Sequence, residues 1–418
     1  MTHLNSLKHL FLRYYRDMGL RVFLYALLSL AATLVAPLVP STFQLPIDDA
    51  FDFSSVTPVL TILASSMLAV TTFSLNIMVS THRAAADTST PRMHRILLSD
   101  TTTQSTLSAF IGAFVYSLGS IILYHLGFYP DEAAIVVMTI TTIVAILVVV
   151  SLLRWIDHLT TLGSLENILS AARHQTETAL NHYAENPLLG TATVAREDTG
   201  SGLVAYLRAP QSGFVQLIDV RQLQQHCPDE TYIHLKVKPG SHLLKGQVIA
   251  KIQGQISQEQ LSDLEDAFTF GPHRTVEQDA EQGLITLSEI GSKALSPGIN
   301  DPGTAIETVI ALKELLWAYG QLDASEADVI APNVTGTFAG PDAFVEAAFA
   351  AIARDGASTR EVVCALWHSL GALKESANDD LARAADAMLE RVRAMANMSN
   401  MSDLELEQIR EEFSGQHK

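Results

Sequence analysis

One apolar segment, residues 56–79, carries a row of small and polar side chains that an arginine follows. The row steps by three or four residues and consists of Thr61, Ser65, Ala69, Thr72, Asn76 and Ser80, with Arg83 after it. In a helix this spacing places all of these residues on one face. Hydroxyl and amide groups can replace part of an ion's hydration shell, so the row predicts a water-filled path. Small and hydroxylated residues also let membrane helices pack closely, and the pattern leaves both interpretations open.

Three arginines, Arg83, Arg92 and Arg95, lie in the segment that follows this row. They are suited to form a basic collar at the inner mouth of such a path, or to bind anionic lipid headgroups. Alternatively, they only set the orientation of the neighbouring apolar segments, because loops rich in lysine and arginine stay in the cytoplasm.

A second set of polar residues surrounds the segment 296–305, which reads Ser-Pro-Gly-Ile-Asn-Asp-Pro-Gly-Thr-Ala. Asp301 precedes Pro302, a typical start of a helix whose first turn the carboxylate caps. The amides of a helix start can hold an anion, and we expect Arg274 and Asp279 to approach this loop. The candidate ligand or subunit-contact residues are Arg274, Asp279, Ser296, Asn300, Asp301 and Thr304. The alternative is a capped turn that its prolines hold rigid.

The sequence lacks the usual signatures of catalysis and of bound cofactors. It has no Walker A, GxGxxG, HExxH or GxSxG motif and no zinc-ligand spacing, and no nucleophile–base pair is recognisable. We therefore expect no enzymatic activity, no cofactor and no metal. The net charge of −18 argues against nucleic acid as a partner. Cys227 and Cys364 lie too far apart in the sequence to indicate a disulfide framework.

Charge is scarce in this chain of 418 residues, at 17%, and the apolar residues gather before residue 154. Four long runs there lack Lys, Arg, Asp and Glu, namely 22–39, 56–79, 107–128 and 133–153. Each has about 18–24 residues, enough for a helix to cross a hydrocarbon core of ~30 Å. The sequence therefore predicts four transmembrane helices. Because no ionisable residue lies inside the runs, a passive path is favoured over a proton-coupled transporter.

The charges of the loops predict the orientation of these runs. Basic residues precede the first run, follow the second and follow the fourth, whereas the other two loops carry only acidic residues. The positive-inside rule then places both termini in the cytoplasm. Residues 154–418 hold 37 acidic and 20 basic residues and account for nearly all of the negative charge. We expect them to form a cytoplasmic, soluble region.

The predicted fold class is mainly α, with four transmembrane helices followed by a cytoplasmic α+β region. We expect a transmembrane domain over 1–153, a helical stalk or linker over 154–189, a small β module over 190–256 and a helical domain over 257–418. Within the β module, residues 237–252 resemble half of a barrel-sandwich fold, with Gly240 and Gly246 in tight turns. No lysine lies in the context of a swinging-arm carrier, so we interpret the module as structural.

The predicted helices of the last region are 257–268, 276–293, 302–319, 341–354, 359–376 and 379–396. Ser257 with Gln260, and Ser358 with Glu361, have the spacing of capping boxes. These patterns predict the first residues of two of the helices.

Three strings of the sequence resemble a known family of bacterial membrane proteins. They are STPRMHRILLSDTTTQ, FGPHRTVEQDAEQGLITLSEIGSKALSPGINDPGTA and, within the second, the distinctive ALSPGINDP. Together with the apolar runs they resemble the predicted membrane proteins of domain of unknown function 2254, over most of the chain up to about residue 320. Thr90 stands where the family usually has a serine. The resemblance implies a bacterial inner-membrane protein and supplies no activity.

The leading functional hypothesis is a homo-oligomeric membrane protein with a channel for an ion or small solute. The second apolar run would line the channel, and the cytoplasmic region would regulate it. The alternative is a membrane-anchored scaffold or sensor that binds a cytoplasmic ligand or partner without conduction. Flux through the purified protein distinguishes the two hypotheses.

Overall fold

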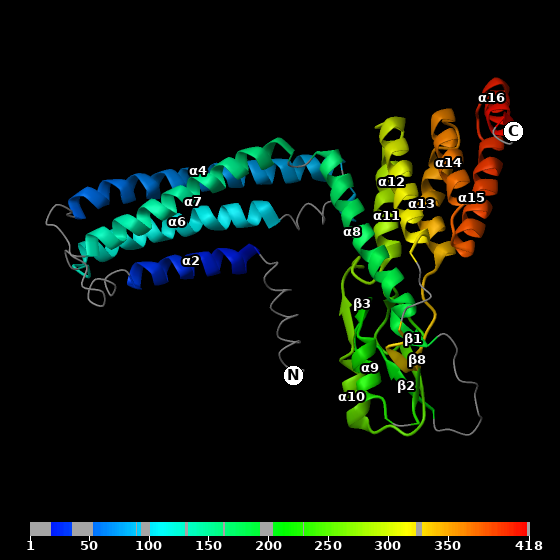
Figure 1. Ribbon diagram of the computed structural model, residues 1–418, viewed down its shortest axis with the longest axis horizontal. Coiled ribbons are helices and arrows are strands. Elements are labelled where there is room, and N and C mark those ends of the chain that lie inside the picture. Colours follow the sequence, from blue (N-terminus) through cyan, green and yellow to red (C-terminus); the bar gives the residue numbers. More distant parts are fainter. Residues whose placement is uncertain are drawn as a thin grey trace. The chain divides into compact units, whose positions relative to one another are not determined.

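The computed structural model describes residues 18–35, 53–88, 90–92, 101–129, 133–161, 164–192, 204–228, 230–322 and 328–415. Helices dominate these residues, and the strands lie in the second half of the chain (Figure 1). The chain divides into two compact units, Met1–Ile168 and Leu169–Lys418. The mainly helical class with a sheet region is therefore confirmed.

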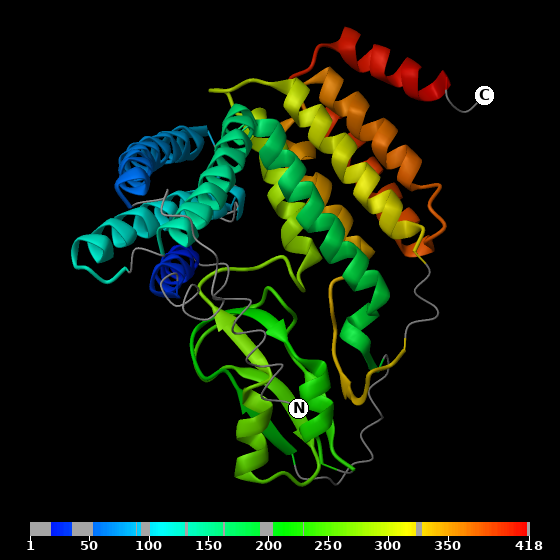
Figure 2. The same ribbon diagram turned by 60° about the vertical axis from the view of Figure 1, so that its left-hand side comes forward.

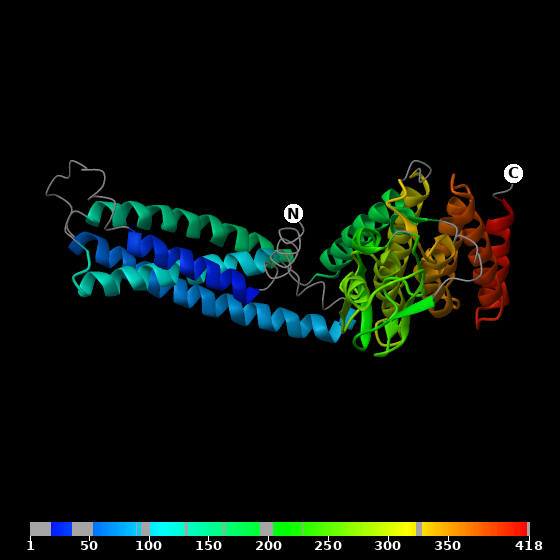
Figure 3. The same ribbon diagram turned by 90° about the horizontal axis from the view of Figure 1, so that it is seen from below.

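The first unit contains the helices α2 (Met18–Val35), α4 (Phe53–Thr88), α6 (Thr101–His125) and α7 (Ala134–Thr161). They lie side by side along their lengths (Figure 3). One apolar cluster joins Phe53 and Val56 of α4 to Tyr116 of α6 and Val137 of α7. A second cluster, further along α4, contains Met67, Phe110, Val148 and Trp155. The interior of this unit is thus formed by α4, α6 and α7.

Three helices among the described residues are long and apolar enough to cross a membrane. They are Ser55–Thr81, Thr102–His125 and Ala134–Leu159. The prediction of four spans is therefore wrong in number. The first predicted run appears as the shorter apolar helix Val22–Val35, about 21 Å long at 1.5 Å per residue, less than the ~30 Å of a hydrocarbon core. The rest of that run, 36–39, lies outside the described residues.

The short helix α2 packs along the candidate span α6 through glycines. A Cβ added to Gly112 would lie 3.2 Å from Ser29 Oγ and 3.3 Å from Tyr25 Cβ, and one on Gly119 would lie 3.8 Å from Thr33. Tyr129 Oη, beyond α6, donates a hydrogen bond to the Thr33 carbonyl at 3.0 Å. Gly112 of α6 contacts Tyr25 and Ser29 of α2, and the later Gly119 contacts the later Thr33. The two helices therefore run in the same direction.

The second unit begins within α8 (Leu165–Glu185) and continues as a helical layer with sheets at one end (Figures 1 and 2). The short helices η2 (Pro187–Gly190), α9 (Val220–His226) and α10 (Gln258–Glu265) accompany the sheets. The longer helices are α11 (Ala280–Ala294), α12 (Pro302–Gly320), α13 (Pro341–Asp355), α14 (Arg360–Leu373), α15 (Asp379–Asn397) and α16 (Asp403–Gly415).

Two sheets form the β region. The larger has the strand order β1-β8-β4-β6-β2 and the smaller has the order β5-β3-β7. Their strands are β1 (Thr191–Ala192), β2 (Val204–Arg208), β3 (Gly213–Ile218), β4 (Tyr232–Leu235), β5 (His242–Leu243), β6 (Val248–Gln253), β7 (Phe268–Gly271) and β8 (Ala331–Thr335). β8 pairs in parallel with both β1 and β4. Apolar side chains between the sheets, including Val215, Ile249 and Ile252, are fully buried.

The sheets take strands from outside the segment predicted as the β module. β7 and β8 lie in residues 257–418, which were predicted as a helical domain; both fall almost entirely between its predicted helices. Each is a run of four or five residues, and Pro332 weakens the strand pattern of β8. The resemblance of 237–252 to a barrel-sandwich half stays a prediction.

The helix predictions of the last region agree with α10 to α15. Ser257 and Gln260 form the predicted capping box of α10. The box predicted at Ser358 and Glu361 is wrong, because α14 begins one residue later, at the N-cap Thr359, which makes no side-chain capping bond.

Candidate functional site

The row of small and polar residues on α4 lies on the surface of the first unit. All six predicted pore-lining residues are exposed, as is Arg83: Thr61, Ser65, Ala69, Thr72, Asn76 and Ser80. The buried residues of the same helix are Phe53, Val56, Leu60, Leu63, Ala64, Met67, Thr71 and Ser74. At 100° per residue the centres of the two sets are roughly 160° apart. The row therefore faces away from the other helices of its own chain.

Three of the four hydroxyl groups of the row are satisfied within α4. Thr61 donates to the Thr57 carbonyl at 2.8 Å, Ser65 to the Thr61 carbonyl at 2.8 Å and Thr72 to the Leu68 carbonyl at 2.9 Å. Asn76 differs, because none of the described residues forms a hydrogen bond with its amide. An amide in hydrocarbon needs such a bond. Asn76 is therefore the residue of the row that most requires water or another molecule.

The structure describes two of the three arginines predicted to form a collar near the end of α4. The helix continues past the candidate span, which ends at Thr81, to Thr88, and Arg83 is exposed on this extension. Arg92 is partly buried and has an interaction within the structure. Arg95 lies outside the described residues. A collar made by all three arginines therefore stays a prediction.

Asp279 and Arg274 form a paired site at the start of α11. Asp279 caps the helix by accepting a hydrogen bond from the Gln282 amide at 3.2 Å. Arg274 donates to both carboxylate oxygens, with Nε at 2.8 Å and Nη2 at 2.9 Å. The Asp279 side chain is 4% exposed and that of Arg274 19%. Such a two-bond pair is strong and directional, and it leaves neither group available as a base or an anion site.

Burial raises the pKa of the Asp279 carboxyl above its ordinary value, although Arg274 acts in the opposite direction. The carboxylate is therefore held in a place where its charge costs free energy unless the arginine stays in position. This coupling makes the geometry around the pair important for the stability of the unit.

A glycine turn from the β region lies directly against this pair. Gly240 has φ +87°, and a Cβ there would lie 2.2 Å from Asp279 Oδ2 and 2.8 Å from Arg274 Nε. Lys238, two residues earlier, forms an ion pair with Glu281 at 2.6 Å. The turn was recognised in the sequence, but its contact with α11 was not, because the partners lie about 40 residues away and no local pattern marks them.

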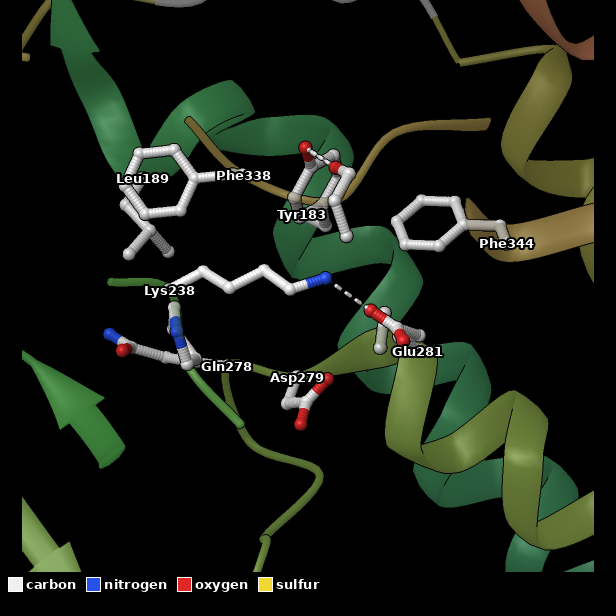
Figure 4. Close-up of a pocket in the computed structure, with 11 residues that line it drawn as sticks. Tyr183, Leu189, Lys238, Gln278, Asp279, Glu281, Phe338 and Phe344 are labelled. Carbon is white, nitrogen blue, oxygen red and sulfur yellow. Dashed lines mark hydrogen bonds and ion pairs between the residues drawn. The ribbon is translucent and has the colours of Figure 1, made fainter. Parts of the chain in front are cut away.

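A cavity of about 20 Å³ lies beside the Lys238–Glu281 pair, with room for about one water molecule. Figure 4 shows the two side chains pointing toward each other, with Tyr183, Phe338 and Phe344 around them. The Tyr183 hydroxyl donates to the Ala339 carbonyl, and burial raises the pKa of this phenol. The cavity is too small for an organic ligand in this state.

The loop between α11 and α12 forms a separate polar site. Asp301 accepts hydrogen bonds from the Thr304 amide at 3.1 Å and the Thr304 hydroxyl at 2.6 Å, as expected for an N-cap followed by proline. The Asn300 amide donates to the Ser296 carbonyl at 2.9 Å, and Asn300 has φ +51°. Residues 297–300 are exposed. The capping prediction is confirmed, and the loop is a closed turn with an exposed tip.

The two polar sites of the second unit do not meet. Arg274 and Asp279 precede α11, whereas Ser296, Asn300, Asp301 and Thr304 follow it. The 15 residues of α11 separate them by about 22 Å at 1.5 Å per residue. The expectation that Arg274 approaches the 296–305 loop is therefore wrong, because the intervening segment is a continuous helix and not a loop that folds back.

The pH dependence of the α12 start follows from Asp301. The Thr304 hydroxyl and then the Thr304 amide lower the pKa of this carboxyl in the folded chain. A lowered folded-state pKa gives stability above the unfolded value of about 3.9 that is lost as pH falls through the folded value. We expect amide exchange in the first turn of α12 to be faster in Asp301→Asn than in the unchanged protein at pH 6, with the difference shrinking as pH falls below the unfolded value of about 3.9. Exchange measured by mass spectrometry would contradict this if the difference were the same above and below this value.

Among the residues that the structure describes, no group of three or more His, Cys, Asp or Glu side chains is arranged to hold a metal ion. Two ion pairs lie near the start of α11 instead, between Arg274 and Asp279 and between Lys238 and Glu281.

The family described as predicted membrane protein (DUF2254) matches residues 16–372 of the chain. Two uncharacterized proteins of Mycobacterium tuberculosis, from the strains CDC 1551 and H37Rv, are each 25% identical over 261 residues, which cover 60% of this chain and 50% of the relative. An uncharacterized protein of Mycobacterium bovis is similar to the same extent. The chain thus spans about half the length of the curated relatives it matches. No solved structure matches it significantly.

Proposed function

The chain belongs to the predicted membrane protein family DUF2254, and from this premise we propose that it assembles into a homo-oligomeric channel for an ion or small solute. In this proposal α4 lines the path with Thr61, Ser65, Ala69, Thr72, Asn76 and Ser80. Arg83, Arg92 and Arg95 lie near its inner mouth. The second unit regulates the path from the cytoplasm.

One observation carries the proposal, namely that the polar row of α4 lies opposite the face that packs within the chain. If a single copy of the chain stood alone in a bilayer, this row would face lipid. The side-chain amide of Asn76 would then remain unbonded in hydrocarbon at a cost of several kcal/mol. A second copy of the chain, or water held between copies, removes that cost. A ring of α4 helices supplies both.

The surroundings of the row support an interface that is polar along one line and apolar beside it. Ile62, Leu68 and Phe73 flank the row and are 68%, 53% and 64% exposed. Side chains of this kind can pack against a neighbouring subunit or against lipid, while the small residues between them leave space for a path. No carboxylate or ammonium group lies along the row, which suits passive conduction.

We further propose that the protein lies in the inner membrane of a bacterium with both termini in the cytoplasm. The arginines at 83, 92, 95 and 154 mark the cytoplasmic side. The start of α6 follows Arg95, and α2 runs in the same direction as α6. In this proposal α2, although its apolar part is shorter than the three candidate spans, also crosses the membrane, and its start lies on the same side as the start of α6. The basic residues Lys8, Arg13, Arg16 and Arg21 agree with this placement.

The proposal includes no catalytic step. Arg274 and Asp279 are bonded to each other, and the candidate residues of the 296–304 loop form a capped turn. These pairings support a regulatory or structural role for the second unit, whose described residues place no nucleophile and base together.

Reconstitution tests the proposal directly. Purified full-length protein in liposomes is expected to pass ions or small solutes faster than protein-free liposomes, measured by fluorescent dye or conductance. The same preparation examined by chemical crosslinking is expected to contain oligomers. Liposomes that hold correctly inserted oligomers and remain tight to a panel of cations, anions and neutral solutes would sink the channel proposal.

A second candidate function is a membrane-anchored scaffold or sensor, favoured by the exposed tip of the α11–α12 loop. Residues 297–300 are exposed, and Ile299 is 47% exposed, which suits a loop that contacts a partner. This function predicts no flux, and it predicts partner binding that Asp301→Ala weakens by loosening the loop. Flux together with unchanged binding in that variant would exclude it.

A further inference from the structure

The buried face of α4 changes character along its length. From Phe53 to Met67 every buried residue of α4 is apolar. The next two buried residues of this helix are Thr71 and Ser74, at 8% and 1% exposure. The α6 residues Thr103 and Thr106, close to the start of that helix, are also buried, at 4% and 6%. The end of the helix bundle nearest Arg83 therefore has a polar interior.

Among the described residues, the buried polar atoms of this interior that form no hydrogen bond include one on α4 and one on α7. They are Ser74 Oγ and the indole Nε1 of Trp155, on residues that are 1% and 2% exposed. Thr71 differs, because its hydroxyl donates to the Met67 carbonyl at 2.7 Å. A buried donor or acceptor without a partner costs about 1–3 kcal/mol. The cost is higher inside a membrane, where no bulk water can reach the group.

The two atoms lie at the same level of the bundle. α4 and α7 run in the same direction, since Phe53 clusters with Ala134 and Met67 with Val148. Ser74 lies seven residues beyond Met67, and Trp155 lies seven residues beyond Val148. Each step advances about 10 Å along its helix in the same direction. Ser74 and Trp155 therefore belong to one layer of the interior, adjacent to the cluster that contains Trp155.

We propose that water binds inside each chain in this layer, between α4 and α7, held by the Trp155 indole and the Ser74 hydroxyl. The indole N–H donates to the water oxygen, and the serine hydroxyl accepts from or donates to it. Buried water of this kind typically bonds to polar groups that otherwise lack partners. The layer lies on the buried face of α4, opposite the row proposed to line the channel, so the site belongs to a single chain and does not depend on the proposed conduction.

The water site is tested by the reactivity of an introduced thiol. In a background with Cys227→Ser and Cys364→Ser, the variants Ser74→Cys and Ala64→Cys place a thiol at two positions of α4 with 1% and 9% exposure. Only the thiolate reacts with (2-aminoethyl) methanethiosulfonate, and a thiol without water beside it loses its proton less readily. Nanodiscs leave both membrane faces accessible. In them, the Ser74→Cys thiol is expected to be modified at least about tenfold faster than the Ala64→Cys thiol. Mass spectrometry measures the extent of modification over time. Equal and slow modification of both variants would overturn the proposal.

A second measurement keeps the test decisive if a cysteine variant fails to assemble. With Trp317→Phe and Trp367→Phe, the remaining fluorescence comes from Trp155. Bound water next to the indole gives a red-shifted emission, and Ser74→Val, which removes one partner of the water, is expected to shift the emission to the blue. Ala64→Val is the matched control and is expected to leave it unchanged. An emission maximum that Ser74→Val does not move would refute the bound water.

Discussion

Leucine at positions 72 and 76 together is expected to lower flux through the reconstituted protein at least about fivefold while leaving oligomers intact. Thr72 and Asn76 are neighbouring exposed residues in the middle of the α4 row. Each hydrogen bond to the path that a passing solute loses costs about 0.5–1.5 kcal/mol. Two of them raise the barrier by about 1–3 kcal/mol, and 1.4 kcal/mol corresponds to a factor of about ten.

The controls for this prediction lie on the same exposed surface of α4. Ile62→Leu and Phe73→Leu alter apolar residues beside the row that are 68% and 64% exposed, and both variants are expected to conduct normally. Single Asn76→Leu is expected to lie between the unchanged protein and the double variant. Unchanged flux in the double variant, with assembly intact by crosslinking, would remove the row from the path. Loss of assembly with the loss of flux would instead identify the row as a subunit interface.

Alanine at Gly240 is expected to destabilise the second unit by about 3 kcal/mol, compared with about 1 kcal/mol for alanine at Gly246. The two glycines form a matched pair, because their φ values are +87° and +88°. A Cβ at Gly246 meets nothing within 4 Å, whereas one at Gly240 lies 2.2 Å from Asp279 Oδ2. Both variants carry the strain of a left-handed backbone, and only Gly240→Ala also displaces the buried Arg274–Asp279 pair.

Thermal unfolding of the full chain in detergent, followed by circular dichroism, measures this difference. For a unit of this size, 1 kcal/mol corresponds to about 2–4 °C, so Gly240→Ala is expected to unfold roughly 4–8 °C below Gly246→Ala. Amide exchange in the first turn of α11 localises the effect, because Asp279 caps that turn. Equal stability of the two variants would show that the ion pair adjusts without cost.

Local patterns in the sequence predicted the features that depend on neighbouring residues. The polar row of α4 follows from its spacing, and the caps at Ser257 and Asp301 follow from residue type and position. The number of spans was overestimated because an uncharged run was counted up to Val39, although the apolar helix described there is only Val22–Val35.

Features that depend on distant residues could not be read from the sequence. The exposure of the α4 row depends on which face of α4 meets α6 and α7, and both faces contain small and apolar residues. Arg274 and Asp279 were recognised as polar candidates, but the contact of this pair with the turn at Gly240 joins segments about 40 residues apart. β7 and β8 are strands only because other strands lie beside them.

The position of β8 sets the order in which the second unit can be built. This strand lies between β1 and β4, although 138 residues lie between the end of β1 at Ala192 and the start of β8 at Ala331. During synthesis, β1, β4 and β6 leave the ribosome well before β8, so β1 and the β4 edge wait unpaired while α11 and α12 are still being made. Unpaired strand edges invite association with other chains. Fragments that stop before residue 335 would keep these edges permanently open, and any shortened version of this unit for biochemical work needs β8 to be soluble.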